Sequence, residues 1–243
     1  APAAKYIPQF GNTGKEVITI RQLLTHQSGL LPDNSIRDYE NGRVQAFQRI
    51  HELDLRAEPG TRFMYSDVGF IVLGEIVERV SGKSLDVFSK ERIFSALGMA
   101  ETGFNPVSAI QKRAAPTQER NGEWMRGEVH DPRAYKLDGV AGHAGLFATA
   151  EDLARYAQML MNDGTLGKTR ILKPETCRLM TTSQKVSSGV RTLGWDRRTG
   201  YSSNRGDLFS AQAFGHGGFT GTALWIDPTQ EMFVIFLSNR VHP

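Results

Sequence analysis

The strongest periodic pattern of apolar residues lies between positions 67 and 81. Four apolar residues recur at a spacing of four: Val68, Val72, Ile76 and Val80. Four more widen the apolar surface: Phe70, Ile71, Leu73 and Val77. Such a broad apolar surface predicts a mostly buried helix. Ser66 or Asp67 suits the N-cap, because a short side-chain oxygen accepts from the free N–H groups of the first turn. Gly82 suits the position just after the helix, so we expect the helix to end there.

Weaker helical patterns occur on both sides of this segment. Thr19, Ser84 and Thr149 each precede an apolar-periodic run, where a hydroxyl side chain caps a helix well. Pro174 suits the first turn of a further helix. We therefore predict helices over residues 20–26, 43–53, 85–97, 150–162 and 174–181. We expect residues 1–18 and 31–42 to be irregular.

From residue 192 onward the pattern changes to that of strands. Residues 193–196 form a short candidate strand, and residues 220–226 and 232–237 flank the turn-forming sequence Asp-Pro-Thr-Gln. This arrangement predicts an antiparallel hairpin. The run 232–237 is apolar at every position, so we expect its strand to be central and covered on both faces.

Separate helical and strand-rich parts predict an α+β fold. A length of 243 residues, 40% of them hydrophobic, suits one domain over residues 1–243 with a sizeable core. We expect about residues 19–190 to be mostly helical and about residues 191–243 to form a C-terminal sheet hairpin. The polar stretch 102–138 gives weak signals, with short strands predicted at 114–117 and 123–126.

Charge and cysteine content narrow the classes of function. The net charge is +3, but the 29 basic residues are scattered among 26 acidic ones, which argues against a nucleic-acid partner. The single Cys177 excludes an internal disulfide and a cysteine-based metal cluster. No apolar run of about 18 residues is present, so we expect no membrane span.

Familiar catalytic and cofactor motifs are missing from the sequence. There is no Gly-x-Ser-x-Gly elbow, and the glycine-rich segment 139–147 lacks the spacing of a phosphate-binding loop. His130, Asp131 and His143 fit no standard metal-ligand spacing. We therefore expect no cofactor and no metal ion. We interpret His26 as a helix-end residue rather than a catalyst.

Three separated segments carry the functional signal. Residues 18–30 read Ile-Thr-Ile-Arg-Gln-Leu-Leu-Thr-His-Gln-Ser-Gly-Leu, and residues 59–67 run from Pro-Gly to Tyr-Ser-Asp at the start of the apolar helix. Residues 215–221 read Gly-His-Gly-Gly-Phe-Thr-Gly, on the leading strand of the hairpin. Each segment alone is a weak signal, whereas their order and separation together are specific.

With these segments the chain resembles the serine β-lactamase and penicillin-binding-protein-like family, especially its class C β-lactamase, D,D-peptidase and esterase branch. The resemblance extends over the whole chain and includes the run Gly-Leu-Phe-Ala-Thr-Ala-Glu-Asp-Leu within residues 141–153. It implies a β-lactamase/D,D-peptidase-like fold, in which helices flank an antiparallel sheet and a mostly helical subdomain adjoins it. It also implies a periplasmic or secreted protein, although the residues themselves leave the compartment open.

The resemblance implies roles for the polar triplet at the start of the apolar helix. Tyr65 takes the place of the tyrosine that acts as acid and base, and Ser66 is the variable middle position. Asp67 stands where the family more often has asparagine, and both Ser66 and Asp67 fall among the expected substrate-binding residues. An amide donates to a substrate carbonyl, whereas an ionised carboxylate cannot.

The third segment corresponds to the family's strand motif beside the substrate. His216 replaces the lysine of that motif, and Gly217 and Gly218 would let substrate lie close to the strand. The resemblance implies that these three residues bind substrate. It also implies that the N–H of Phe219 is one of two oxyanion-hole donors.

The nucleophile motif of the family, Ser-x-x-Lys, does not occur in the 243 residues. The nearest match is Thr182-Ser183-Gln184-Lys185, in which threonine replaces serine and which lies far from the expected place. By comparison with the family we expect a chain truncated at both ends. Its N-terminal strands and nucleophile helix would be missing, as would the closing C-terminal helix.

Two functions remain open. The first is a serine hydrolase that acts through an acyl-enzyme on a β-lactam, a D-Ala-D-Ala-type peptide or an ester, with a small-molecule or peptidoglycan-like substrate. The second is a catalytically inactive β-lactamase-like binding or partner protein. We favour the first for the parent protein, and expect this chain alone to have little acyl-transfer activity. We also expect the open sheet edge at 232–237 to pair with a second copy or with the missing N-terminal segment.

Overall fold

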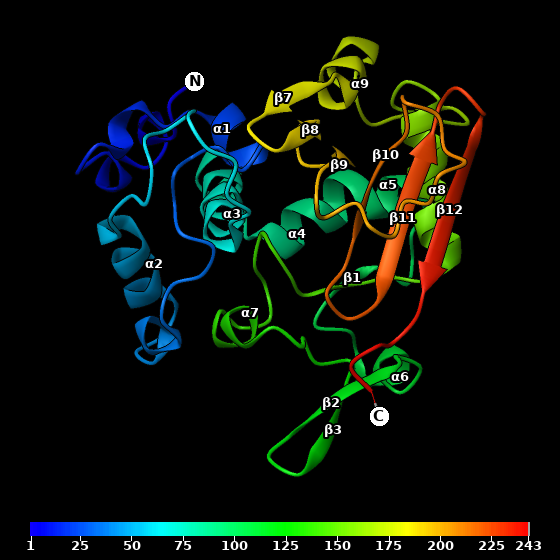
Figure 1. Cartoon of the computed structure of the whole chain (residues 1–243). Coiled ribbons are helices and arrows are strands. Elements are labelled where there is room, and N and C mark those ends of the chain that lie inside the picture. The colour runs from blue at the N-terminus through cyan, green and yellow to red at the C-terminus, as the bar shows by residue number, and fades with distance from the viewer. Residues whose placement is uncertain (243) are drawn as a thin grey trace. The chain divides into compact units, whose positions relative to one another are not determined.

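The structure is a computed structural model and describes residues 1–242. Helices and antiparallel sheets both occur, which confirms the α+β class (Figure 1). The chain forms two compact units. Unit 1 contains residues 1–88 and 131–145, and unit 2 contains residues 89–130 and the chain from Leu146 onward. Unit 1 thus draws on two separate stretches of sequence.

Unit 1 is helical. Its elements are three short 3₁₀ turns at Ala3–Lys5, Pro8–Phe10 and Lys15–Val17, the 3₁₀ turn Ile36–Tyr39, and the α-helices α1 (Ile20–Leu24), α2 (Arg43–Glu52), α3 (Asp67–Ser81) and α7 (Pro132–Lys136). The stretch 1–18, expected to be irregular, therefore contains short helical turns. Helix α4 (Leu85–Ser89) crosses the boundary between the units.

Helix α3 is the central element of unit 1 and matches the predicted bounds. The Ser66 hydroxyl accepts a hydrogen bond from the Gly69 N–H, and Gly82 follows the helix with a positive φ of 67°. Val68, Ile71, Val72 and Ile76 are buried and give the helix its core face, each contributing about 1.5–3 kcal/mol. Val80, which the pattern included in this face, lies in the last turn of the helix and is 64% exposed instead.

The predicted helix over residues 85–97 begins in unit 1 and is divided by a π-helical turn. The helical elements of unit 2 after α4 are the π turn Lys90–Phe94, α5 (Ser95–Leu97), α6 (Ser108–Gln111), α8 (Ala150–Met161) and α9 (Pro174–Thr181). Three small antiparallel pairs join β1 (Gly103–Phe104) to β4 (Leu146–Phe147), β2 (Pro116–Arg120) to β3 (Glu123–Arg126), and β5 (Thr165–Leu166) to β6 (Thr169–Arg170). The predicted caps Thr149 and Pro174 both occupy their expected positions.

The main sheet of unit 2 has six strands in the order β12-β11-β10-β9-β8-β7, with antiparallel neighbours (Figure 1). The strands are β7 (Gln184–Val186), β8 (Gly189–Arg191), β9 (Asp196–Arg198), β10 (Phe214–Gly217), β11 (Thr222–Asp227) and β12 (Met232–Leu237). Phe214, Leu224 and Ile226 belong to one buried cluster with residues of α5, α8 and α9. The predicted hairpin is thus confirmed, with Thr222 opposite Leu237 and Asp227 opposite Met232.

The expectation that residues 232–237 form a central, doubly covered strand is wrong for the described residues. β12 is the edge strand of the sheet, and Met232, Val234 and Phe236 are 39%, 42% and 61% exposed. Phe233 and Ile235 alternate with them and pack against the core cluster. One face of β12 is therefore buried and the other is open. The outer edge of β12, which the sequence analysis expected to pair with another segment, is open as well.

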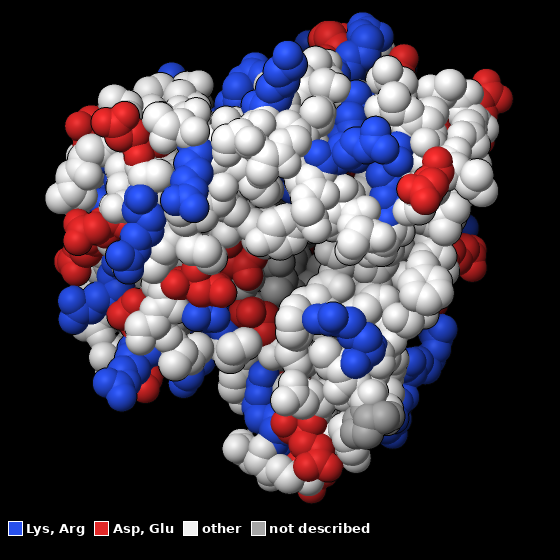
Figure 2. Space-filling model, in the orientation of Figure 1, with Lys and Arg blue, Asp and Glu red and all other residues white. Residues whose placement is uncertain are grey.

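Charged side chains are interspersed over the visible face of the molecule (Figure 2). Lys and Arg alternate there with Asp and Glu, as the scattered charges of the sequence predict. Among residues 1–242, no helix is long and apolar enough to cross a bilayer.

Candidate functional site

Tyr65 is fixed by the imidazole of His26. The two rings are stacked with centroids 4.2 Å apart, and the ring of Phe70 stacks on the same imidazole at 4.9 Å. The Ser66 N–H donates to Nδ1 of His26 over 3.0 Å, and the Met64 N–H donates to the His26 carbonyl over 2.8 Å. His26 thus holds the strand-like segment before α3 through both its ring and its backbone.

The sequence indicated a helix-end role for His26, and the structure adds a positioning role. His26 follows α1 with a left-handed φ of 55° and is only 2% exposed. Because Nδ1 accepts a backbone hydrogen bond, the neutral imidazole carries its proton on Nε2. The local sequence shows only that His26 ends a helix. Its partners lie about forty residues further along the chain, so no local signal reveals the second role.

Ser66 is the N-cap of α3, as predicted for Ser66 or Asp67. Its hydroxyl accepts from the Gly69 N–H over 3.1 Å and donates to the Leu31 carbonyl over 2.7 Å. The residue is 1% exposed. Both hydrogen-bonding functions of the hydroxyl are therefore used inside the fold, and a contact between Ser66 and substrate stays a prediction.

Asp67 is the first residue of α3 and its carboxyl group is unusually basic. Its pKa is raised to about 6, mainly by burial; the charges of Asp33 and Asp131 add to this rise, and those of His143 and Arg133 oppose it. Its backbone N–H donates to the Pro32 carbonyl over 2.9 Å. Asp67 is mostly ionised at neutral pH and becomes protonated in mildly acidic solution.

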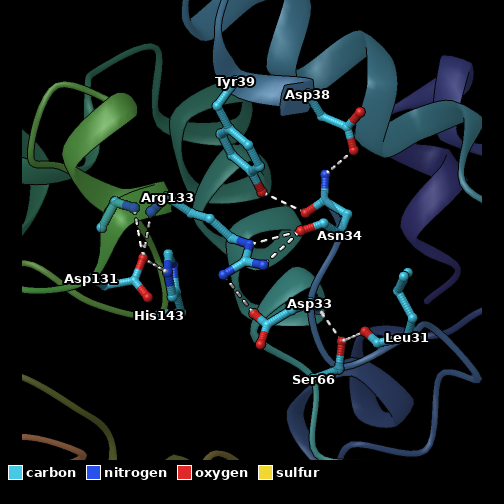
Figure 3. Close-up of polar contacts among 11 residues, drawn as sticks. Leu31, Asp33, Asn34, Asp38, Tyr39, Ser66, Asp131, Arg133 and His143 are labelled. Atoms are coloured by element: carbon cyan, nitrogen blue, oxygen red, sulfur yellow. Dashed lines mark hydrogen bonds and ion pairs between the residues drawn. The ribbon is translucent and has the colours of Figure 1, made fainter. Parts of the chain in front are cut away.

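Asp131 and His143 form a second polar pair in unit 1 (Figure 3). Nε2 of His143 lies 2.9 Å from Oδ1 of Asp131, which also accepts from the N–H groups of Arg133 and Ala134 and so caps α7. Burial alone would raise the pKa of Asp131, but the His143 contact and the two backbone N–H groups outweigh it and lower that pKa. Asp131 therefore remains ionised where Asp67 is protonated.

Gly142 permits the close approach of this pair to α3. A Cβ atom on Gly142 would lie 1.9 Å from the Phe70 carbonyl oxygen, and one on Gly74 would lie 3.1 Å from the Gly142 nitrogen. Only glycine at position 142 lets the turn pack directly against the first turns of α3. The neighbouring His143 is thereby brought to the start of that helix.

A network around Asn34 supports the same region (Figure 3). Arg133 donates from Nε and Nη2 to the Asn34 carbonyl over 2.9 and 2.6 Å, and Nη1 lies 3.4 Å from Asp33. The Tyr39 hydroxyl donates to Oδ1 of Asn34, whose Nδ2 donates to Asp38. Burial raises the pKa of Tyr39, so this phenol stays protonated and acts as a donor.

Asp67, Asp131 and His143 are the group among the described residues that has metal-ligand geometry. Their candidate ligand atoms all lie within 4.8 Å of one another. The sequence led us to expect no metal ion, because His130, Asp131 and His143 fit no standard spacing; in the structure Asp67 of α3 joins Asp131 and His143. His130 belongs to unit 2, where its Nε2 lies 2.8 Å from Oε1 of Gln118.

His216 lies on β10 in unit 2. Its Nδ1 donates to the Gly217 carbonyl over 2.7 Å, which leaves Nε2 as the lone-pair nitrogen of the neutral ring. Burial lowers the pKa of His216, and the charge of Arg191 lowers it further. Arg191 and Asp196 form a fully buried pair at 3.6 Å that the sequence analysis did not identify. His216 is therefore neutral at neutral pH.

The glycines after His216 are required by packing within unit 2. A Cβ atom on Gly217 would lie 2.4 Å from the Asn204 amide, and one on Gly218 would lie 2.4 Å from the Thr222 hydroxyl. The Phe219 ring is 68% exposed, with the His130 ring at 5.6 Å and the Arg240 guanidinium at 4.7 Å. These facts place the predicted residues on one strand end, while their roles toward substrate stay predictions.

The predicted site residues thus fall into two groups, one in each unit. Tyr65, Ser66 and Asp67 belong to unit 1, whereas the segment from His216 to Phe219 belongs to unit 2. Within unit 1 the structure adds Asp131, His143 and the positioning residue His26 to the predicted set.

The family model named Beta-lactamase matches residues 1–243. The chain belongs to the β-lactamase family. A putative D-alanyl-D-alanine carboxypeptidase of Escherichia coli (strain K12) is 34% identical over 270 residues, covering 98% of this chain and 62% of the relative. An N-acetylmuramyl-L-alanine amidase of Bacillus subtilis (strain 168) is 33% identical over 272 residues, covering 98% of this chain and 60% of the relative.

A solved structure shares the fold. The octameric penicillin-binding protein homologue from Pyrococcus abyssi matches with a TM-score of 0.73 at 24% identity, covering 100% of this chain and 56% of that one. The resemblance and fold predicted from the three sequence segments are therefore confirmed. The chain spans about three fifths of the length of the curated relatives that it matches.

Proposed function

We propose that this β-lactamase-family chain carries the acid/base and pocket residues of a serine hydrolase that works through an acyl-enzyme. The favoured substrate class is a peptidoglycan-like compound with an amide bond next to alanine. The names of the two relatives, a D-alanyl-D-alanine carboxypeptidase and an N-acetylmuramyl-L-alanine amidase, support this class over β-lactams and simple esters.

The fixed position of Tyr65 is the observation that carries the proposal. Its ring is held against His26 at 4.2 Å, directly before the cap of α3. A proton carrier must keep one geometry through the reaction, and a stacked and hydrogen-bonded support provides that. Tyr65 would take the proton of the attacking serine hydroxyl and deliver it to the leaving amine.

The strand end of unit 2 supplies the second part of the proposed mechanism. The neutral His216 would line the pocket, and the Phe219 N–H would donate to the oxyanion of the tetrahedral intermediate. The Phe219 N–H makes no hydrogen bond in the described part of the chain, which suits a donor reserved for a ligand. The attacking serine belongs to a Ser-x-x-Lys motif, which the 243 residues do not contain.

The test uses protein expressed from the complete reading frame of the gene. We expect incubation with a chromogenic ester, a cephalosporin and an alanyl-alanine peptide to give a serine adduct detectable by mass spectrometry. Tyr65→Phe should slow acylation by about 10²- to 10⁴-fold. Tyr201→Phe removes the hydroxyl of a tyrosine that is 53% exposed in unit 2 and should leave the rate unchanged. Equal rates for Tyr65→Phe and wild type would disprove the proposal.

The absence of Ser-x-x-Lys from the 243 residues favours a second candidate, an inactive binding or partner protein. We expect the 243-residue chain by itself to form no acyl adduct with these substrates. An adduct located on this chain would refute that expectation and identify another nucleophile.

The octameric assembly named for the Pyrococcus abyssi homologue also supports the proposal that this chain self-associates.

A further inference from the structure

Three side chains from distant parts of the sequence meet in unit 1. Asp67 begins α3, Asp131 caps α7, and His143 lies in the glycine-rich turn after α7. One carboxylate oxygen of each aspartate and one imidazole nitrogen lie within 4.8 Å of one another. Two carboxylates and an imidazole form a ligand set that suits divalent transition metals.

The imidazole of His143 is buried in a way that calls for a ligand. Its side chain is only 3% exposed, and its hydrogen bond is to Asp131, inside the cluster. Nδ1 is buried without a hydrogen-bond partner in the part of the chain that the structure describes. The ring is therefore compensated for its lost hydration at Nε2 alone, by a bond that stays inside the cluster.

The spacing of the ligand atoms fits a bound ion. Nε2 of His143 and Oδ1 of Asp131 are 2.9 Å apart in a hydrogen bond. A zinc ion at about 2.1 Å from each atom would replace the shared proton and keep a similar separation of about 3 Å. The Asp67 carboxylate accepts no hydrogen bond from the described residues and is free to turn toward such an ion. Arg133, the neighbouring cation, is already bound to Asn34 and Asp33.

We propose that Asp67, Asp131 and His143 bind one divalent transition-metal ion of the zinc class. Three protein ligands leave open coordination positions for water or another small donor. The ion would join the start of α3 to α7 and the glycine-rich turn. It also gives the aspartate at position 67 a role that an asparagine amide fills poorly. The inference does not depend on the proposed hydrolase activity, because metal binding itself is measured.

The experiment titrates Zn²⁺ into the tag-free, chelator-treated 243-residue chain by calorimetry, in competition with a chelator of known affinity. We expect one ion per chain and a dissociation constant in the micromolar range or tighter. Asp67→Asn and His143→Gln should each weaken binding by about tenfold or more, because each removes a ligand. Added Zn²⁺ should raise the melting temperature of the wild type and leave that of Asp67→Asn unchanged.

Matched controls separate this site from other zinc ligands. Asp207→Asn removes an exposed carboxylate of unit 2, His130→Gln removes a histidine of unit 2, and Cys177→Ser removes the single thiol. All three should bind Zn²⁺ like the wild type. Co²⁺ in place of Zn²⁺ should give weak visible bands without a thiolate charge-transfer band.

Circular dichroism shows whether each variant is folded. If His143→Gln unfolds, Asp67→Asn decides the question, since its side chain is only half-buried. The proposal fails if the wild type binds Zn²⁺ only in the millimolar range. It also fails if Asp67→Asn binds as tightly as the wild type, or if Cys177→Ser abolishes binding.

Discussion

His26 supports several residues of unit 1 at once. Its ring contacts Tyr65 and Phe70, and its Nδ1 is the acceptor for the buried N–H of Ser66. A histidine of this kind acts on catalysis only through the residue that it positions. The proposed acid/base Tyr65 depends on this support for its geometry.

His26→Phe separates the two contributions of this ring. Phenylalanine keeps an aromatic surface for stacking but provides no acceptor for the Ser66 N–H. We expect a loss of about 1–3 kcal/mol in the free energy of unfolding, measured by urea denaturation. His26→Ala removes the stacking as well and should cost more. Equal stability of His26→Phe and wild type would show that the hydrogen bond contributes nothing.

Asp67 should give stability a characteristic pH dependence in chelator-treated protein. Its pKa rises from 3.8 to about 6 on folding, so the folded state favours the protonated carboxyl. This stabilisation is complete below about pH 4 and is lost as the pH rises through 6. The wild type should lose up to about 3 kcal/mol of unfolding free energy between pH 4 and pH 8 through this group, whereas Asp67→Asn should not. The stability of Asp67→Asn relative to the wild type should therefore be higher at pH 8 than at pH 4 by the same amount.

Thermal melts of both proteins at pH 4 and pH 8 check this expectation. Asp207→Asn serves as the control, because it changes an exposed carboxyl of unit 2 and should leave the pH dependence unchanged. A stability difference between Asp67→Asn and wild type that is the same at both pH values would contradict the assigned pKa.

At the level of elements, the helices were predictable where local chemistry marks their ends. Ser66 and Gly82 bound α3, Thr149 caps α8, and Pro174 opens α9, all as the sequence indicated. Each of these signals acts within one turn of the chain and needs no tertiary partner. Helix α7 was missed because it is only five residues long and carries no apolar period.

The contact between α3 and the glycine-rich turn gives the sharpest prediction at this scale. Gly142→Ala should destabilise the protein by about 3 kcal/mol or more, because its Cβ would lie 1.9 Å from the Phe70 carbonyl oxygen. Gly103→Ala is the matched control, since nothing lies within 4 Å of its added Cβ. Chemical denaturation of both variants makes the comparison, and similar stabilities would argue against the close contact.

The candidate site was predictable only in part, for a related physical reason. Tyr65 and Asp67 were identified by a local motif, but His143 is 76 positions from Asp67 and has no spacing that marks a shared site. Tertiary packing through Gly142 brings them together. The sequence shows which residue types could bind a metal ion, but it does not show that a turn brings these residues together.

For the whole molecule, family membership was predictable because three ordered segments extend along the chain. The position of β12 was not, since an apolar run is equally compatible with a central strand and with an edge strand that has an open face. Sheet order is decided by pairing partners elsewhere in the chain. The division into units was likewise not visible, because residues 131–145 return to unit 1.

The open edge and face of β12 predict self-association of the 243-residue chain. Val234→Lys places a charge on a strand residue that is 42% exposed, which should reduce edge pairing and the measured mass in sedimentation experiments. Val44→Lys makes the same change on α2, at a residue that is 76% exposed, and should leave the mass unchanged. A monomeric wild type at tens of micromolar would rule out this interface.

The return of residues 131–145 to unit 1 has a consequence for biosynthesis. During translation residues 1–88 emerge before the stretch that completes their unit, and the 42 residues of 89–130 separate the two. Asp67 thus stays without Asp131 and His143 until those intervening residues have left the ribosome. Stalled or prematurely terminated chains ending before residue 131 would expose an unfinished unit to proteases.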